Sequence, residues 1–189
     1  QMLGLKSPYL LITQENIPSI RGAAQVFGLT FTPGTWVESI QITKGAGSVI
    51  NGYESIAGQI NAELQKPATD APLFLNVFAA ANGRQELNAH VNHGVTDRWS
   101  TGIYIHGNQR RKTVDRNDDD FLDTPKGDQI NIMNRWQYID PVNGWVSFIN
   151  ARILSDRKVA GATAFDRDQE LSVDNPWGSI IDTDRIDLS

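Results

Sequence analysis

Residues Val37 to Pro67 read VESIQITKGAGSVINGYESIAGQINAELQKP, and they carry more structural information than any other stretch of the chain. Two β-type runs, Val37 to Thr43 and Ile56 to Leu64, flank a turn that is punctuated by glycine. Glycine residues between strands supply positive φ angles and allow close backbone approach. The stretch therefore predicts two strands joined by a compact turn whose backbone depends on glycine.

This stretch resembles the end of the plug domain in TonB-dependent outer-membrane receptors. In that family a strand leads into a Lys-Gly turn, continues as a Gly-x-x-x-Ile-x-Gly-x-Ile-Asn strand, and reaches Lys-Pro at the exit into the barrel. The matching residues stand in the same order: Lys44, Gly45, Ser48, Gly52, Ile56, Gly58, Ile60, Asn61, Lys66 and Pro67. Such an ordered set of matches is far more specific than a lone glycine motif.

The segment upstream fits the same resemblance. Tyr9 to Thr13 is strand-like in composition. Glu15-Asn16-Ile17-Pro18 then stands where the family has an Asp-Gly-x-Pro turn, and Asn tolerates the left-handed conformation that Gly supplies there. The start of the chain, the NGYES segment at 51–55 and an acidic loop look most like receptors of the Bacteroidetes type.

A linker with two prolines, KPATDAP at 66–72, predicts the domain boundary, because proline resists both helix and central strand. After it, apolar residues alternate with Asn, Gln, His and Arg in runs of about ten residues, the length that crosses a bilayer when tilted. Tight turns at 96–98 and 140–144 alternate with long polar connections at 108–129 and 157–180, as in outer-membrane barrels. Four aromatic residues lie near the ends of these runs, where an interfacial girdle would be: Trp99, Trp136, Tyr138 and Trp145.

We therefore expect a mostly β chain with two parts. Residues 1–68 would be the C-terminal part of a plug domain, and residues 69–189 the opening antiparallel strands of a transmembrane β-barrel. Because the chain starts at Gln1 and stops within a strand pattern at Ser189, without a signal peptide, we expect a fragment of a large plugged barrel. No apolar run is long enough for a transmembrane helix.

The resemblance implies a function in the bacterial outer membrane. Such receptors bind a scarce nutrient, which can be a siderophore, a metal, cobalamin or an oligosaccharide, and import it actively. Their partners are the outer-membrane lipid, the small nutrient ligand and the TonB complex, here through a missing N-terminal segment. By alternation, the side chains expected to face the barrel lumen are Asn88, His90, Asn92, His106, Asn131, Arg135, Asn150 and Arg152.

A second interpretation stays open. Alternating strands also describe a soluble extracellular all-β binding module whose apolar faces pack on a second sheet. In this interpretation calcium could bind the loop at 115–123, which places oxygen ligands at Asp115, Asn117, Asp119 and Asp123. An EF-hand is excluded, since Asp120 and Lys126 stand where Gly and Glu are required. A solvated acidic loop explains the same residues.

Composition excludes several classes of protein. The 189 residues contain no cysteine, so neither a disulfide framework nor a thiolate metal site can form. A formal net charge of −5 argues against a nucleic-acid partner. No catalytic or phosphate-binding motif appears, so we expect no enzyme activity and no required cofactor. Two of the three histidines, His90 and His106, could meet across neighbouring strands, whereas His93 should face the opposite side.

Overall fold

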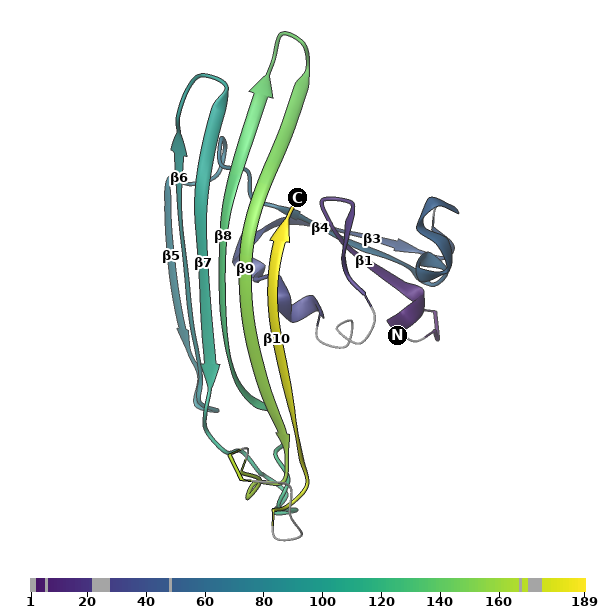
Figure 1. Ribbon diagram of the computed structural model, residues 1–189, viewed down its shortest axis with the longest axis vertical. Coiled ribbons are helices and arrows are strands. Elements are labelled where there is room, and N and C mark those ends of the chain that lie inside the picture. The colour runs from purple at the N-terminus through teal and green to yellow at the C-terminus, as the bar shows by residue number, and fades with distance from the viewer. Residues whose placement is uncertain (1–2, 6, 22–27, 48, 167, 170–174) are drawn as a thin grey trace. The chain divides into compact units, whose positions relative to one another are not determined.

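The computed structural model describes residues 3–5, 7–21, 28–47, 49–166, 168–169 and 175–189. The chain is mostly β and divides into two compact units, residues 1–69 and residues 70–189, each with its own sheet (Figure 1). The boundary expected from the prolines lay one residue earlier. No helix in the described ranges combines the length and the apolar character that crossing a membrane requires.

The sheet of the first unit has four strands in the order β2-β1-β4-β3. They are β1 (Leu10–Gln14), β2 (Ile17–Ile20), β3 (Val37–Lys44) and β4 (Gly58–Leu64). Strand β1 pairs antiparallel with β2 and parallel with β4, and β3 pairs antiparallel with β4. The two strands expected around the glycine turn are confirmed, although β4 starts two residues later than predicted, at Gly58.

Short 3-10 helices lie before and between these strands: η1 (Ser7–Tyr9), η3 (Gly28–Phe31), η4 (Gly34–Trp36) and η5 (Val49–Ser55). The β1–β2 connection is a two-residue turn in which Glu15 and Asn16 have φ angles of 55° and 62°. Two positive φ angles define the type I′ hairpin that matches strand twist. The buried apolar side chains of the unit come from both strands and helices: Leu11, Ile12, Ile20, Phe31, Trp36, Ala57 and Leu64.

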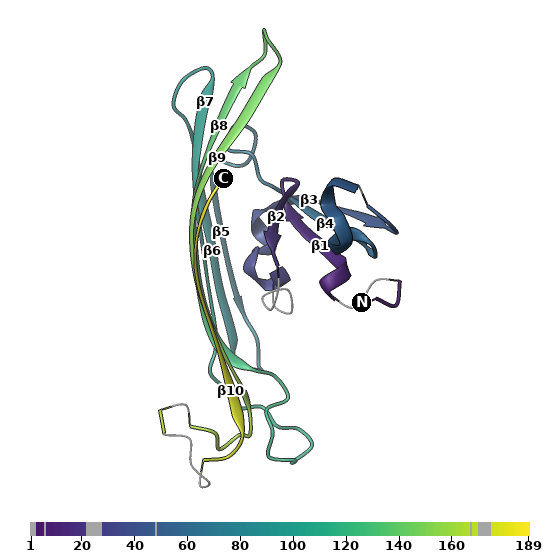
Figure 2. The same ribbon diagram turned by 45° about the vertical axis from the view of Figure 1, so that its right-hand side comes forward.

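The second unit is a six-stranded antiparallel sheet in which each strand pairs with its neighbour in sequence. Its strands are β5 (Leu73–Ala79), β6 (Arg84–Gly94), β7 (Trp99–Arg110), β8 (Lys126–Asp140), β9 (Trp145–Gly161) and β10 (Gly178–Leu188). Figure 2 shows the long strands bending along their length. Among the described residues, β5 and β10 are the edges of this open sheet.

The connections of this sheet differ between its two ends. Short turns at 95–98 and 141–144 lie at one end, as predicted. The long connections at the other end are shorter than expected, because β7, β8 and β9 continue to pair through polar residues that the sequence interpretation assigned to loops. A tight turn at 80–83, between β5 and β6, also lies at that end. The sequence interpretation did not predict this turn, because it did not predict β5 as a strand.

Candidate functional site

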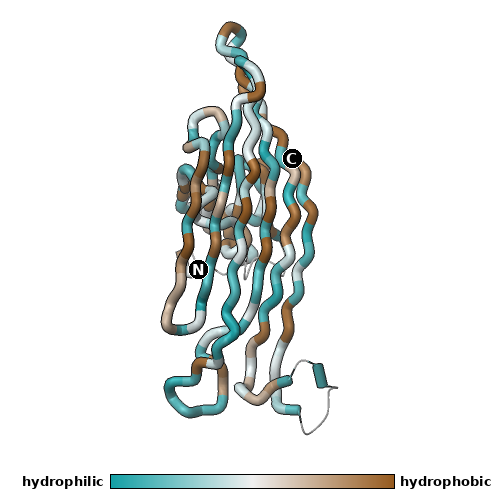
Figure 3. The backbone as a smooth tube through the Cα atoms, turned by 90° about the vertical axis from the view of Figure 1, so that its left-hand side faces the viewer, coloured by the Kyte–Doolittle hydropathy of each residue, from teal (hydrophilic) through white to brown (hydrophobic). Residues whose placement is uncertain are grey.

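Side chains on one face of the six-stranded sheet form an unbroken apolar row, and we call this side the apolar face. The strand register sets six residues in one line across the strands: Leu75, Ala89, Ile105, Ile132, Ile153 and Ile186. The five large members are 39–77% exposed. Figure 3 shows hydrophobic residues recurring along these strands. A contiguous exposed apolar surface is unfavourable in water, so this face requires an apolar environment.

The apolar face is bounded at both ends. Near the short turns, the Trp99 ring lies 6.3 Å from that of Trp136 and 5.0 Å from that of Tyr138, measured between centroids. Toward the long connections, the register places a polar row across five strands: Gln85, Gln109, Asp128, Arg157 and Asp182. An aromatic cluster, an apolar zone and a polar row therefore follow one another along the strands.

The opposite side of the sheet, the polar face, carries the side chains that alternation singled out. The structure places Asn88, His90, Asn92, His106, Asn131, Arg135, Asn150 and Arg152 together on it, each 7% exposed or less. Buried polar groups are costly unless they are hydrogen-bonded. Their hydrogen bonds therefore determine what this face can do.

One chain of hydrogen bonds starts on β5 and crosses to β7. Asn88 Nδ2 donates to Asn76 Oδ1 at 3.2 Å, and Asn88 Oδ1 lies 2.6 Å from His106 Nδ1. His106 Nε2 lies 2.9 Å from Asn108 Nδ2. Because an amide nitrogen only donates, His106 Nε2 accepts from Asn108 and Nδ1 carries the proton. His106 is thus held as one neutral tautomer between two amide side chains.

The same chain continues to β9. Asn108 Nδ2 also lies 3.3 Å from Gln129 Oε1, and Gln129 Nε2 donates to Asp156 Oδ1 at 3.0 Å. The second oxygen of Asp156 is paired with the Lys158 ammonium. Gln129 and Asp156 are both about 5% exposed. They lie beyond the runs that the sequence interpretation recognised, which began at Ile130 and ended at Ile153. Extending the alternation by one residue before Ile130 and by three residues after Ile153 would have found them.

Two arginines on the polar face are bound by amide oxygens. Arg135 Nη1 donates to Asn150 Oδ1 at 2.8 Å, and its guanidinium carbon lies 4.0 Å from the centroid of the Phe148 ring. Arg152 Nε donates to Asn131 Oδ1 at 2.8 Å. Planar guanidinium groups suit such combined hydrogen-bonding and stacking contacts. The polar face therefore holds fixed cations among neutral amides.

The segment before β5 is fastened to the polar face at Asp70, a residue that sequence reasoning missed. Asn92 Nδ2 donates to Asp70 Oδ2 at 3.0 Å and to the Ala71 carbonyl at 2.8 Å. His90 Nε2 lies 2.8 Å from the same carboxylate oxygen, an ion-pair distance without the alignment of a hydrogen bond. The His90 ring stacks on Phe74 with centroids 4.7 Å apart.

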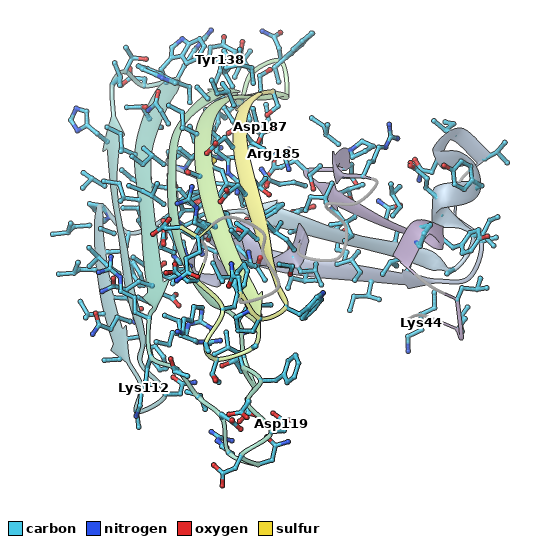
Figure 4. All side chains as sticks on the ribbon, turned by 60° about the horizontal axis from the view of Figure 1, so that its bottom comes forward. Lys44, Lys112, Asp119, Tyr138, Arg185 and Asp187 are labelled. Carbon is cyan, nitrogen blue, oxygen red and sulfur yellow. The ribbon has the colours of Figure 1, made fainter. Side chains whose placement is uncertain are left out.

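The family-matched residues of the first unit share backbone and hydrogen-bonding roles. Gly45, Gly52 and Gly58 have φ angles of 94°, 63° and 142°, a range that favours glycine. Lys44 is exposed at the end of β3 (Figure 4), and Ser48 lies outside the described residues. Ile56 is 48% exposed, and Ile60 is half-buried on β4. Asn61, also on β4, is buried and accepts two hydrogen bonds from the β1–β2 hairpin.

The acidic loop uses its oxygens internally. Asp115 accepts the backbone N–H of Asp120 at 3.0 Å, Asp119 accepts that of Phe121 at 2.9 Å, and the Asn117 amide donates to Asp119 at 2.8 Å. Figure 4 labels Asp119 in this loop, and Asp123 is exposed. In the described part of the chain, no three His, Asp or Glu side chains converge as a metal site. Calcium binding at Asp115, Asn117, Asp119 and Asp123 stays a prediction.

The two buried histidines do not face each other directly. The register pairs His90 with Tyr104 and Asn88 with His106, so the two rings are diagonal neighbours. His93 is exposed, away from the polar face, as alternation predicted. Neither a scan of protein-family models nor a search of curated proteins returned a match to this chain.

Proposed function

We propose that this chain belongs to a TonB-dependent outer-membrane receptor that binds and imports a scarce nutrient. In this proposal residues 1–68 are the C-terminal part of the plug, and residues 69–189 are the first strands of the transmembrane β-barrel. The single observation that carries it is the two-faced sheet, in which one apolar row crosses all six strands and buried amides and cations line the other side.

The dimensions of the apolar face support a lipid environment. From Trp99 in the aromatic cluster to Gln109 in the polar row, β7 rises about 33 Å. At a strand tilt of about 40°, this corresponds to a height of about 25 Å, which is the height of the apolar band in outer-membrane barrels. Aromatic residues at the band edge match the interfacial preference of Trp and Tyr.

The polar face supports the assignment of a hydrated lumen. A barrel that holds a removable plug needs a wall that binds through polar contacts, because such contacts can be exchanged for water. The row of Asn, Gln, His and Arg side chains meets that requirement, and its members are fixed by neighbours on adjacent strands. Fixed donors and acceptors lose little conformational entropy when a partner binds.

The first unit supports the plug assignment through its motif. Three matched glycines occupy backbone conformations that favour glycine, and matched Asn61 joins β4 to the β1–β2 turn. Import itself follows from the resemblance to the receptor family. The proposed partners are the nutrient, the outer-membrane lipid and the TonB complex, which would act through a segment N-terminal to the plug.

The membrane part of the proposal is tested by fluorescence quenching. The full chain is reconstituted in vesicles as single-tryptophan variants that retain Trp99, Trp136 or Trp36. Lipids brominated along the acyl chain should quench Trp99 and Trp136, because these residues edge the apolar face. The control is Trp36, which is 1% exposed within the first unit and should be quenched far less. Equal quenching of all three, or of none, would contradict a membrane-spanning sheet.

The import part is tested in the bacterium that encodes the chain. Deleting the gene should abolish growth when one nutrient is limiting and supplied only as an iron–siderophore complex, cobalamin or an oligosaccharide. Growth should return with the wild-type gene in trans. A deletion strain that takes up each of these nutrients at the wild-type rate would overturn the transport function while leaving the quenching result untouched.

A further inference from the structure

The start of β5 is weakly held by the sheet ladder itself. Among the described residues β5 pairs only with β6, and all but one of its side chains are exposed. The Pro72 carbonyl accepts the Asn92 backbone N–H at 2.9 Å, but proline has no N–H with which to return a hydrogen bond. Strand ends with few buried contacts open most easily. The start of β5 should therefore fray unless other contacts hold it.

Side chains of β6 supply such contacts to residues 70–72, and we call this segment the linker anchor. Asn92 Nδ2 donates to Asp70 Oδ2 at 3.0 Å and to the Ala71 carbonyl at 2.8 Å. With its backbone bond to the proline, Asn92 thus binds each of the three residues of the anchor. The same Asp70 oxygen lies 2.8 Å from His90 Nε2. The anchor therefore sits on two neighbouring polar-face side chains of one strand.

Asn92 is in turn fixed by β7, the next strand into the sheet. Its Oδ1 accepts the hydroxyl of Tyr104 at 2.9 Å, and Tyr104 is fully buried. Gly102 lies opposite Asn92 in the β6–β7 register. A Cβ atom at Gly102 would come 2.3 Å from Asn92 Oδ1 and 2.7 Å from a ring carbon of Tyr104. Gly102 therefore leaves the space in which these two side chains meet, and the anchor is tied to two strands.

The residues just before the anchor are attached to the first unit instead. The Gln65 backbone N–H donates to the Trp36 carbonyl at 2.8 Å, and the Lys66 ammonium is paired with the Glu38 carboxylate. Only residues 67–69 lie between this attachment and the linker anchor. The division between the two compact units falls where the anchor begins. The connection between the units is therefore short and is fastened at both of its ends.

We propose that the linker anchor keeps β5 paired with the sheet when the first unit opens or changes position. Motion of the first unit would pass along residues 67–69 and end at Asp70, because Asn92 and His90 hold the chain there. In the proposed receptor, the first barrel strand would then stay in place while the plug is displaced. The anchor needs only two units and a linker, so this inference goes beyond nutrient import and does not rest on it.

Amide hydrogen exchange of the full chain in detergent tests the anchor. The probes are Phe74, Asn76 and Phe78, whose N–H groups face β6 by the alternation of an antiparallel pair. Asp70→Ala should speed exchange at Phe74 about tenfold and at Phe78 less, because the strand opens from its start. The control Asp97→Ala removes an exposed carboxylate from the turn after β6 and should change neither. No change in Asp70→Ala, or an equal change on β5 and β8, would overturn the anchor.

Opening the first unit on purpose tests whether the anchor isolates β5. Trp36→Ala removes a ring that is 1% exposed and should speed exchange on β4 about a hundredfold or more. With the anchor intact, exchange at Phe74 should change less than about twofold. Adding Asp70→Ala to Trp36→Ala should then speed Phe74 exchange about tenfold. Faster Phe74 exchange in Trp36→Ala alone, or none in the double variant, would overturn the proposal.

A second variant weakens the anchor from β7 and leaves the first unit intact. Gly102→Ala pushes a Cβ atom against Asn92 and should speed Phe74 exchange several-fold. Gly94→Ala, at a glycine with open space around its Cβ position, is its control and should not. Unchanged Phe74 exchange in Gly102→Ala would overturn the link to β7. A chain whose tryptophans are quenched in vesicles but whose β5 exchange is unchanged in Asp70→Ala refutes the anchor alone.

Discussion

Asn61 on β4 accepts a hydrogen bond from the Thr13 hydroxyl at 2.8 Å, and the same oxygen accepts the backbone N–H of Asn16 at 2.8 Å. One side chain of the glycine motif thereby fixes both a strand residue and the turn that follows it. Thr13 and Asn61 are each 2% exposed. The parallel pairing of β1 with β4 thus ends in a polar link at the hairpin.

Removing the Asn61 side chain should destabilise the first unit. Asn61→Ala leaves the buried Thr13 hydroxyl without this partner and frees the Asn16 N–H, at a cost of about 2 kcal/mol. The measurement is amide hydrogen exchange at Asn16, which should become faster by at least about tenfold. Asn61→Asp keeps an accepting oxygen and should therefore destabilise the unit less than Asn61→Ala.

The matched control for this prediction is Gln41→Ala. Gln41 lies directly opposite Asn61 in the β3–β4 register but is exposed, and its amide nitrogen donates to Glu63 on the surface. Its amide oxygen lies 3.5 Å from Asn61 Nδ2, so removing Gln41 leaves both hydrogen bonds to Asn61 Oδ1 in place. Its loss should change stability by less than about 0.5 kcal/mol. A Gln41→Ala effect as large as that of Asn61→Ala would show that Asn61 acts only through strand pairing.

The sequence predicted those features of the fold that depend on local pattern alone. Alternation gave the correct face for His90 and His93, because side-chain direction in a strand depends only on parity. It missed β5, whose LFLNVFA run is apolar at every position except Asn76 and so does not alternate, and it therefore also missed Asn76 as the end of the hydrogen-bond chain. Local patterns hold no information about which residues a strand register will bring opposite each other.

The contact between Asp70 and His90 was out of reach for the same reason. The prolines of the linker marked a boundary, but they could not indicate that Asp70 lies against His90, which is in the middle of β6.

Gly161→Ala should disrupt the start of the β9–β10 pairing. Gly161 has a φ of 127°, and an added Cβ would lie 2.5 Å from the Gly178 Cα and 2.6 Å from the Trp177 carbonyl oxygen. Both neighbours are backbone atoms, so we expect a loss of about 2 kcal/mol or more. Urea unfolding in detergent measures it. Gly94→Ala, at a glycine with open space, should change stability by less than about 0.5 kcal/mol.

Charge on the apolar face should cost more at its centre than at its edge. Ile132→Arg places a cation in the middle of the apolar row and should destabilise the bilayer-inserted chain by about 2–4 kcal/mol. Gln109→Arg adds the same charge on the same face in the polar row, at a cost of about 1 kcal/mol or less. Vesicle partitioning after urea titration gives both values. Equal costs would mean that no lipid contacts the row.

Asp140 joins the two short turns, outside the apolar zone. Its carboxylate accepts the Asn143 side-chain amide at 2.9 Å and the Val142 backbone N–H at 3.1 Å. Arg98 Nη1, from the other turn, lies 3.3 Å from Asp140 Oδ2. The Asn143 side chain, these backbone donors and the Arg98 charge hold the pKa of Asp140 below its ordinary value of 3.8.

A lowered carboxyl pKa means that the charged form is preferred in the folded turn. The contribution of Asp140 to stability should therefore be complete above pH 3.8 and be lost as the pH falls through the lowered pKa. Carboxyl-detected NMR titration of the chain measures this pKa. Asn143→Ala should raise it more than Arg98→Gln, because the Asn143 hydrogen bond is the larger cause. A larger rise in Arg98→Gln would assign the shift to the link between turns instead.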